Sequence, residues 1–398
     1  MKYKLLSSLF YSDKDLYEST YKKRISSEST YVFDFKIHNN NSFLVLNNEV
    51  LNLIDDIISF DKQLYKIIND LPDIALFKYK HECIISEVKT TNDIEGVHST
   101  RKEISDIIND KDNKLKNKRL FGIVKKYEML FENNNIDLVT CSDIRNLYND
   151  IALQDVLLED KNNTPDGEFF RTDTVDVTNQ YGKVVHSGII YESEIINHMN
   201  IALSILNNNT YNFLIRIAVF HYMFGYIHPF YDGNGRTSRF ISSYLLSQKL
   251  EKVVSYNLST TIRNNLGSYG RIFNTTNDIK NKGDMTSFVI YFLSTIKDSI
   301  VNLCDYLGSM RDKITYYKNI IPSLDFNDSI SSILFVLIQN DLFGGHHLGI
   351  YELSAIFDVS STTARKHIKT LIDSEFVSVS KNSNKHFFNV NFNKFDNI

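Results

Sequence analysis

At 398 residues the chain is long enough for two or three domains, and 42% hydrophobic with 23% charged residues is typical of a globular protein rather than a disordered one. The formal net charge of −4 provides no overall attraction to nucleic acid or to an anionic membrane, so any such contact would be local. Three widely spaced cysteines (Cys83, Cys141 and Cys304) form no CxxC pair, which argues against a disulfide framework and a zinc site.

The N-terminus gives no sign of a targeting segment. The apolar run at residues 5–11 is too short for a secretion signal. No run approaches the roughly 20 apolar residues needed to span a bilayer. The expectation is a cytoplasmic protein without a membrane partner.

Hydrophobic periodicity predicts mostly helices. Residues 31–37 alternate like a strand and lead into an asparagine turn at 39–41. Apolar residues at three- and four-residue spacing then predict helices over about 51–68, over about 76–95 and within 120–153. Residues 165–190 are rich in turn formers, and segments 174–178 and 183–186 could pair as a short hairpin across 179–182. Helices resume from about 192 to 312, and residues 328–398 form a separate small module.

The centre of the chain carries a turn between two helices. An apolar helix over 211–227 must end before Pro229, because the residue preceding a proline is disfavoured in the helical conformation. A glycine-bearing turn at 232–236 then opens a second amphipathic helix. Backbone N–H groups and the helix dipole make such a turn a natural anion site.

Side chains around this turn suit phosphate chemistry. Arg236 and Arg239 lie on one face of the first helical turn and can both reach a polyphosphate. Asp232 offers a hard oxygen ligand for Mg²⁺ beside the phosphates. His228 lies at the end of the preceding helix, where a neutral imidazole could accept a proton. The pattern predicts a phosphoryl or nucleotidyl transfer site.

Residues 228–239 match every fixed position of the signature HPFx[DE]GN[GK]RxxR, so the chain resembles the Fic family over about 110–305. The resemblance implies a protein adenylyltransferase, which moves AMP from ATP to a Ser, Thr or Tyr hydroxyl of a target protein or of itself. It also implies a role for each matching position. His228 is the general base, Asp232 coordinates the Mg²⁺ that bridges the α- and β-phosphates, and Gly233, Asn234 and Gly235 form the anion pocket.

By the same resemblance, Arg236 holds the β-phosphate and Arg239 the γ-phosphate of ATP. Phe230 anchors the loop in the core. Residues 168–190 correspond to the flap, a hairpin that docks the target segment by strand addition. Tyr269 falls where the family often has an aromatic side chain near the nucleobase.

A glutamate upstream completes the resemblance. Gly96 is predicted to cap the helix over about 76–95, which leaves Glu95 facing the negative end of the helix dipole unless a cation compensates it. Residues 91–96 resemble the [ST]xxxE[GN] inhibitory motif of Fic proteins, in the N-terminal position of class II. The resemblance implies that Glu95 pairs with Arg239 and prevents the γ-phosphate of ATP from seating, so the resting state is autoinhibited.

The C-terminal module, with three helices followed by two alternating strands, resembles a winged helix. Its basic side chains could contact DNA phosphates from the third helix and from the wing: Arg365, Lys366, Lys369, Lys381 and Lys385. The same module could instead serve homodimerisation or partner selection, since the basic cluster is not strong.

The expected fold is therefore mainly α. It has an N-terminal helical segment with the inhibitory motif (1–110), a Fic core with one short hairpin (111–310), a linker (311–327) and a winged-helix-like domain (328–398). Gly235 argues against the phosphate-transferring branch of the family, which carries lysine there, and the two arginines favour a triphosphate donor. UMP or phosphocholine transfer and removal of AMP remain open, as do a DNA-binding regulator whose core only senses nucleotide and a scaffolding role.

Overall fold

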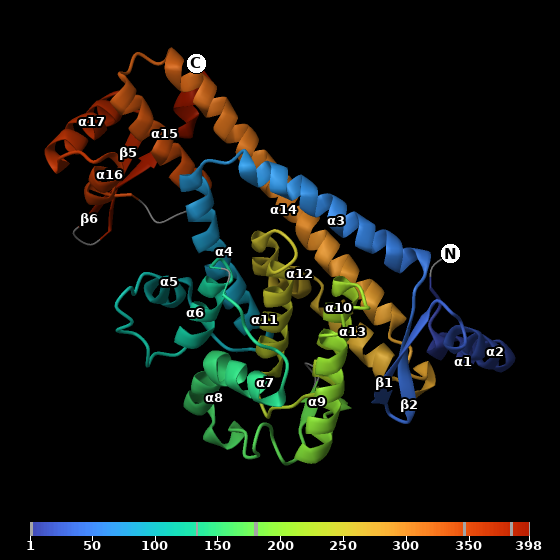
Figure 1. Ribbon diagram of the computed structural model, residues 1–398. Coiled ribbons are helices and arrows are strands. Elements are labelled where there is room, and N and C mark those ends of the chain that lie inside the picture. Colours follow the sequence, from blue (N-terminus) through green and yellow to red (C-terminus); the bar gives the residue numbers. More distant parts are fainter. Residues whose placement is uncertain (1–2, 133, 179–181, 345–347, 383–384, 398) are drawn as a thin grey trace. The chain divides into compact units, whose positions relative to one another are not determined.

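The computed structural model describes residues 3–132, 134–178, 182–344, 348–382 and 385–397 (Figure 1). It is mainly helical, which confirms the predicted fold class. In these ranges the strands form three antiparallel pairs: β1 (Thr30–Ile37) with β2 (Asn40–Val45), β3 (Asp176–Thr178) with β4 (Val184–Ser187), and β5 (Val377–Asn382) with β6 (Lys385–Val390). The chain divides into two compact units, unit 1 (1–62 and 84–301) and unit 2 (63–83 and 302–398).

Three long helices contribute residues to both units: α3 (Asn48–Asn69), α4 (Asp73–Ile94) and α14 (Thr286–Ile320). The other α-helices of unit 1 are α1 (Leu6–Ser12), α2 (Lys14–Ile25), α5 (Arg101–Ile108), α6 (Phe121–Met129), α7 (Cys141–Tyr148), α8 (Gln154–Glu159), α9 (Glu192–Leu206), α10 (Phe213–Ile227), α11 (Asn234–Ser247), α12 (Leu258–Asn264) and α13 (Leu266–Asn277). A π-helix, η1 (Asn149–Leu153), joins α7 to α8. Short 3₁₀ turns complete unit 1: η2 (Lys161–Asn163), η3 (Lys252–Tyr256) and η4 (Ile279–Asn281).

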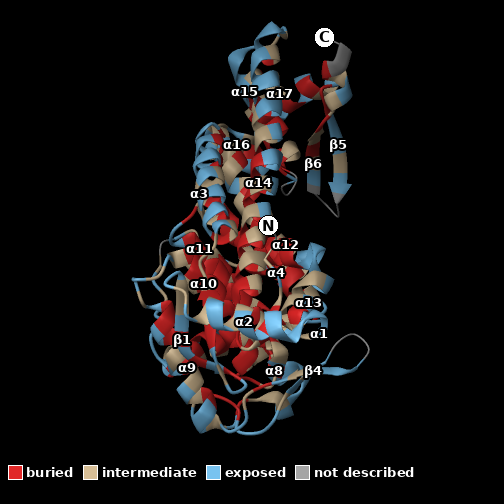
Figure 2. Cartoon of the chain, turned by 90° about the vertical axis from the view of Figure 1, so that its right-hand side faces the viewer, coloured by how far each residue is buried: buried red, intermediate tan, exposed pale blue. Residues whose placement is uncertain are grey.

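Helices α10 and α11 form the core of unit 1. Asn212 caps α10 by accepting a hydrogen bond from the Leu214 N–H at 2.9 Å. Twelve of the fifteen residues of α10 are buried, because the helix is apolar around its whole circumference. Helix α11 is as deeply buried, with twelve of its fourteen residues in the interior, and Figure 2 shows the buried residues concentrated on these two helices. The loop between them therefore has a rigid support on both sides.

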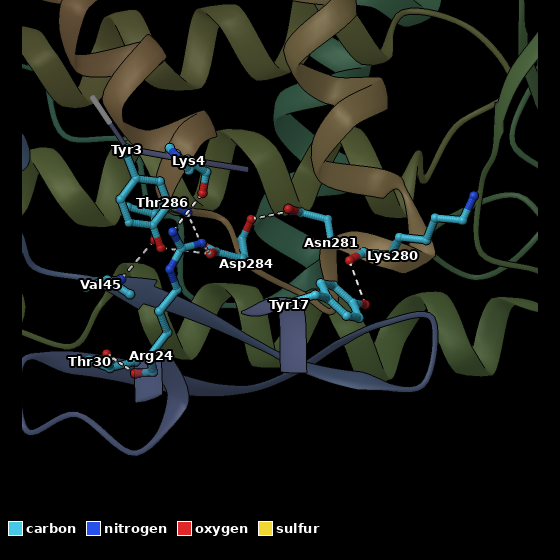
Figure 3. Close-up of polar contacts among 10 residues, drawn as sticks. All are labelled: Tyr3, Lys4, Tyr17, Arg24, Thr30, Val45, Lys280, Asn281, Asp284 and Thr286. Atoms are coloured by element: carbon cyan, nitrogen blue, oxygen red, sulfur yellow. Dashed lines mark hydrogen bonds and ion pairs between the residues drawn. The ribbon is translucent and has the colours of Figure 1, made fainter. Parts of the chain in front are cut away.

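The N-terminal segment is tied to the start of α14 through Asp284 (Figure 3). Its carboxylate accepts hydrogen bonds from the Tyr3 hydroxyl at 2.8 Å and from the Arg24 guanidinium at 3.0 Å. Burial raises the pKa of Asp284. The backbone of Phe43 exchanges hydrogen bonds with Gly283 and Met285, both at 2.9 Å. Sequence reasoning missed α1, α2 and β2. Arg24 of α2 and Phe43 of β2 make these contacts, and Leu6 and Leu9 of α1 share a hydrophobic cluster with Phe43.

Helix α14 is the longest element. Together with η5 (Ile321–Ser323) it is the one helical stretch of the described residues that is long and apolar enough to cross a membrane, and its most apolar 18 residues have a mean hydropathy of 1.2. However, 56% of its most apolar window is buried, as in the core helix of a globular protein, so this stretch is weak evidence for a membrane span. Residues 311–320 belong to α14, so helix occupies most of the expected linker.

Unit 2 contains α15 (Asp328–Leu342), α16 (Ile350–Phe357), α17 (Ser361–Asp373) and the β5–β6 hairpin, followed by the 3₁₀ turn η6 (Phe392–Asn397). Ser360 caps α17 by accepting a hydrogen bond from the Thr363 N–H at 3.1 Å. The apolar faces of the three helices and the hairpin meet in one core, which includes Leu337, Leu353 and Leu371. The element order is the predicted one of three helices and a hairpin.

Candidate active site

The turn after α10 is built around His228. This residue adopts the left-handed conformation with a φ of 51° and caps α10, its N–H donating to the Phe224 carbonyl oxygen at 2.9 Å. Phe230 is fully buried two residues later and stacks on Tyr148 with ring centroids 3.7 Å apart. The backbone of the turn is therefore fixed by a helix end on one side and an aromatic anchor on the other.

Helix α11 begins at the end of this turn, with Gly233 as its N-cap at a φ of 78°. The side chain of Asn234 closes the turn: its Oδ1 accepts from the Phe230 N–H at 2.9 Å and its Nδ2 donates to the Phe230 carbonyl oxygen at 2.7 Å. The Asn234 side chain is thus engaged within the loop. What this residue can offer an anion is its backbone N–H, together with those of Gly235 and Arg236 in the first turn.

Two arginines on α11 are buried and face different partners. Arg236 is fully buried, and its Nη1 donates to Asp155 Oδ2 on α8 at 3.2 Å. Arg239 is 1% exposed and points toward the end of α4. Its Nε donates to Thr91 Oγ1 at 2.8 Å, and its Nη2 donates to the Thr91 carbonyl oxygen at 3.0 Å.

Glu95 forms an ion pair with the guanidinium of Arg239. Helix α4 ends in a Schellman motif, in which the Val97 N–H donates to the Asn92 carbonyl oxygen and the Gly96 N–H to that of Asp93. Gly96 has the required positive φ of 75°, which confirms its predicted capping conformation. Glu95 Oε1 lies 2.7 Å from Arg239 Nη2, so the carboxylate that opposes the α4 dipole is compensated by a buried cation.

One cavity brings most of the predicted residues together. It has a volume of about 880 Å³, and its lining includes Glu95, His228, Asn234, Gly235, Arg239 and Tyr269. Val177 and His186 of the β3–β4 hairpin also line it. Asp232, Gly233 and Arg236 are not among the lining residues, and the side chain of Arg236 is fully buried. The tip of the hairpin, residues 179–181, lies outside the described part of the chain.

His228 has the properties of a neutral base. Burial lowers its pKa to about 4, His186 contributes in the same direction, and Glu95 opposes the shift. A hydrogen bond from one ring nitrogen to the backbone of Gly225 also opposes the shift, and in a neutral imidazole the other ring nitrogen is an acceptor. At neutral pH the imidazole is therefore uncharged and can take a proton.

Tyr269 is held by a buried histidine. The Ser242 hydroxyl donates to the Ser238 carbonyl oxygen, so Ser242 Oγ must accept from His221 Nδ1 at 2.8 Å. His221 Nε2 then accepts from the Tyr269 hydroxyl at 2.6 Å. Burial lowers the pKa of His221 to about 3, which keeps this chain of hydrogen bonds in one direction. Sequence reasoning identified Tyr269 but missed His221, whose position in an apolar helix carries no motif.

A second residue missed by sequence reasoning, Arg171, links the hairpin to the base. Its side chain is fully buried, and its Nε donates to the carbonyl oxygen of His228 at 2.9 Å. The same guanidinium donates to the carbonyl oxygens of Asp173, before β3, and of Ile189, after β4, the latter at 2.8 Å. A Cβ on Gly188 would lie 2.4 Å from Arg171 Nη2, so glycine is needed there. One side chain thus fixes both ends of the hairpin and the His228 turn.

The residues present fit a magnesium ion only in part. Within the described ranges no group of three or more His, Cys, Asp or Glu side chains could hold a metal. Asp232 is half-buried beside the head of α11 and accepts from the Gly233 N–H. A single carboxylate with the remaining ligands from phosphates and water is the usual way in which proteins bind Mg²⁺.

Comparison with known proteins places this site in a family. Residues 140–246 match the model of the Fic/DOC family, a range that includes the His228 turn and α11. A Fic family protein from Desulfovibrio desulfuricans G20 has a similar fold, with a TM-score of 0.52 at 18% identity over 87% of this chain and 97% of that one. This chain therefore contains a Fic/DOC domain.

Two further solved structures show weaker likeness. A Fic domain containing signaling protein from Bacteroides thetaiotaomicron VPI-5482 gives a TM-score of 0.44 at 17% identity, over 64% of this chain and 97% of that chain. Fic-1 from C. elegans gives 0.42 at 16% identity, over 64% of this chain and 72% of that chain.

The basic residues of unit 2 lie on its surface. Arg365, Lys366 and Lys369 are exposed on one face of α17, and Lys381 is exposed on β5. The side chain of Lys385 lies outside the described residues. This face belongs to unit 2, whereas the residues that line the cavity belong to unit 1.

Proposed function

We propose that this chain is a protein adenylyltransferase that transfers AMP from ATP to a hydroxyl side chain and is held inactive by Glu95. Fic domains are generally nucleotidyl transferases, and the site carries the groups that such a transfer needs. The observation that supports this proposal best is that His228, Gly235, Arg239 and Glu95 line one cavity. A base, the first turn of an anion-binding helix, a cation and its blocking carboxylate are within reach of one ligand.

The residues define the reaction as follows. A target hydroxyl oxygen attacks the α-phosphorus of ATP, the bond from that phosphorus to the bridging oxygen of the β-phosphate breaks, and pyrophosphate leaves. The hydroxyl proton passes to the free ring nitrogen of His228, which is uncharged at neutral pH. N–H groups at the start of α11 stabilise the negative charge on the phosphates. Tyr269 borders the part of the cavity in which the nucleobase would lie.

Asp232 is the residue that would hold Mg²⁺. When bound, the ion would neutralise charge on the phosphates during the transfer. Its carboxylate lies at the entrance to α11, one residue before the N-cap, where phosphates and metal would meet.

Inhibition follows from competition for Arg239. The Glu95 carboxylate accepts from Nη2 at 2.7 Å and is 24% exposed at the cavity wall. A phosphate oxygen that needs the same donor must displace a carboxylate that is already paired. Two negative groups cannot share this position, so the γ-phosphate of ATP cannot seat while Glu95 is in place.

Removal of AMP is a second candidate activity. Glu95 and His228 line the same cavity, and Glu95 is close enough to raise the pKa of His228. A carboxylate beside the base could orient a water molecule toward the phosphorus of an AMP-modified side chain. In this reaction Glu95 would be required rather than inhibitory.

For unit 2 we propose a winged-helix module that contacts nucleic acid through α17. The proposal is supported by the order of its elements and by three cations on the exposed face of that helix. Homodimerisation is the other use of such a module.

The experiment that tests the activity uses the Glu95→Gly protein with cell lysate, Mg²⁺ and ATP labelled on either the α- or the γ-phosphate. Label from α-ATP but not from γ-ATP on protein is the expected result, because AMP transfer retains the α-phosphate and releases the other two. Label from γ-ATP alone would show phosphate transfer instead and contradict the proposal. The pre-modified target incubated with wild-type chain tests AMP removal in the same assay.

A further inference from the structure

Three polar atoms at the head of α11 are buried and without a hydrogen-bond partner among the described residues. They are the hydroxyl oxygen of Tyr148 and two nitrogens of Arg236, Nε and Nη2. Both side chains are fully buried. A buried polar atom without a partner destabilises a protein, and neighbouring donors of this kind at a helix N-terminus are what a bound anion would satisfy.

The two side chains that carry these atoms both lie against Gly233. If Gly233 had a Cβ, it would lie 3.2 Å from Cε2 of Tyr148 and 3.7 Å from Nη2 of Arg236. The two side chains therefore flank the residue that opens α11. Asp232 and Arg236 are also close enough to affect the pKa of Tyr148 in opposite directions, while burial raises it.

The guanidinium of Arg236 is oriented for a ligand. Its Nη1 is engaged by Asp155 at 3.2 Å, which fixes the plane of the group. The two unpartnered nitrogens, Nε and Nη2, form one edge of the guanidinium, and this edge matches two oxygens of a phosphate or carboxylate. The guanidinium is thus held through Nη1, while its buried Nε–Nη2 edge has no protein partner among the described residues.

The position of Tyr148 is equally fixed. It is the last residue of α7, its ring stacks on Phe230 at a centroid distance of 3.7 Å, and the π-helix η1 follows directly. A π-helix changes the register of the chain and frequently occurs at functional sites. Here η1 places Ala152 against Gly233, with its Cβ 2.9 Å from the Cβ position of the glycine, and leads into the helix that carries Asp155.

We propose that Tyr148 is a nucleotide-binding residue whose hydroxyl donates a hydrogen bond to the same anionic group that the free edge of Arg236 binds. The proposal rests on the proposed function, because it takes that anion to be the β,γ part of a nucleoside triphosphate. Tyr148 lies outside the 228–239 motif, so the motif alone does not reveal it. Its hydroxyl and the two arginine nitrogens provide three donors to one anion beside the N-terminus of α11.

The test uses Tyr148→Phe in the Glu95→Gly protein, which removes one oxygen and retains the ring that stacks on Phe230. Titration calorimetry with ATP, AMP and inorganic pyrophosphate is the measurement. We expect the variant to bind ATP and pyrophosphate about 10-fold or more weakly, since a hydrogen bond to a charged group is lost. AMP, which lacks the β- and γ-phosphates, should bind within about 3-fold of the parent.

Thermal stability supplies an independent readout. Without ligand, Tyr148→Phe should melt at the same temperature or higher, because it removes a buried hydroxyl that has no partner. Tyr256→Phe is the matched control: that hydroxyl is also buried but donates to the Tyr127 carbonyl oxygen at 2.8 Å. The control should melt at a lower temperature and bind ATP like the parent.

Equal ATP affinity in Tyr148→Phe and its parent would overturn the assignment of Tyr148 while leaving the proposed function intact. A loss of affinity that is equal for ATP and AMP would also overturn it, because the hydroxyl would then not act on the β,γ phosphates. If the Glu95→Gly parent binds neither ATP nor pyrophosphate, the proposed function fails and this inference fails with it.

Discussion

Glu95 Oε1 lies 2.7 Å from Nη2 of Arg239, and a Cβ on Gly235 would lie only 2.1 Å from the same carboxylate oxygen. The end of α4 is therefore packed directly against the first turn of α11. The Glu95 carboxylate pairs with the Arg239 guanidinium and also fills the space next to Gly235. Under the proposed function, the end of α4 would therefore block the position of the γ-phosphate.

Thr91 is predicted to support inhibition. Its Oγ1 accepts from Arg239 Nε at 2.8 Å, and it is fully buried. Thr91→Val keeps the shape but leaves Nε unpaired, which removes one of the hydrogen bonds that hold Arg239 against the end of α4. We expect AMP transfer to rise to between wild type and Glu95→Gly, by up to about 10-fold. Thr91→Ser, which keeps the hydroxyl, should remain inhibited; equal rates for the two variants would contradict this role.

Arg171 is predicted to position the base. In the Glu95→Gly background, Arg171→Gln should lower kcat about 10- to 100-fold, because it releases His228 from the ends of the hairpin. ATP affinity should stay within about 3-fold, since α11 is untouched. Steady-state kinetics combined with ATP titration separates the two effects.

Two further variants sharpen this prediction. Gly188→Ala places a methyl group against Arg171 Nη2 and should reproduce the loss in kcat. Arg145→Gln is the matched control, because Arg145 donates to the Phe169 carbonyl oxygen in the same segment but does not contact His228. An equal loss of kcat in the control would indicate a general effect on folding rather than positioning.

Two buried titratable groups are expected to make the free energy of unfolding depend on pH, and their effects have opposite signs. Burial lowers the pKa of His221 to about 3, so its contribution to stability is present above about 6.5 and is lost as the pH falls toward 3. Burial raises the pKa of Glu87 to about 7, against hydrogen bonds from the Ser259 N–H and the charge of Arg239. Its contribution is present below about 4.5 and is lost as the pH rises toward 7.

Single variants should separate the two slopes. Between about pH 4.5 and 6.5 each group changes the free energy of unfolding by about 1.4 kcal/mol per pH unit, in opposite directions. Glu87→Gln should therefore make stability rise more steeply with pH than in wild type, and His221→Gln should make it rise less or fall. Urea unfolding followed by tyrosine fluorescence at several pH values measures this. Parallel curves for all three proteins would refute both assignments.

The proposal that the exposed cations of α17 contact nucleic acid can be tested with duplex DNA. If unit 2 contacts duplex DNA, binding should weaken steeply between about 50 and 200 mM salt and be reduced in Arg365→Ala/Lys369→Ala. Lys22→Ala/Lys23→Ala removes two exposed cations from α2 and is the control expected to bind normally. Gel-shift titration at several salt concentrations measures the affinity of the parent and of each variant. No binding even at low salt would exclude DNA as the partner.

Sequence reasoning anticipated the parts of the site that depend on local order. The helix before Pro229, the glycine-bearing turn and the cap at Gly96 follow from backbone rules that act within a few residues. The resemblance then linked Glu95 to Arg239 across 144 positions, and the structure places the two side chains in contact. Local rules without the motif could not have made this link.

The rest depends on packing between distant segments. Arg171 and Arg236 are fully buried although arginine is normally exposed, so neither burial could be anticipated from residue type. Asn234 was expected in the anion pocket, yet its side chain is bonded to the Phe230 backbone, and only the folded turn reveals this. Tyr148 carries no motif, and its place beside α11 follows from a π-helix that no periodicity predicts.

The most direct test of inhibited AMP transfer compares the rates at which label from α-labelled ATP appears on protein for wild type, Glu95→Gly and Glu95→Gly/His228→Ala. We expect a low rate for wild type, a rate at least about 10-fold higher for Glu95→Gly, and loss of nearly all transfer without His228. Equal rates for wild type and Glu95→Gly would contradict the inhibitory role of Glu95, and undiminished transfer without His228 would contradict its role as the base.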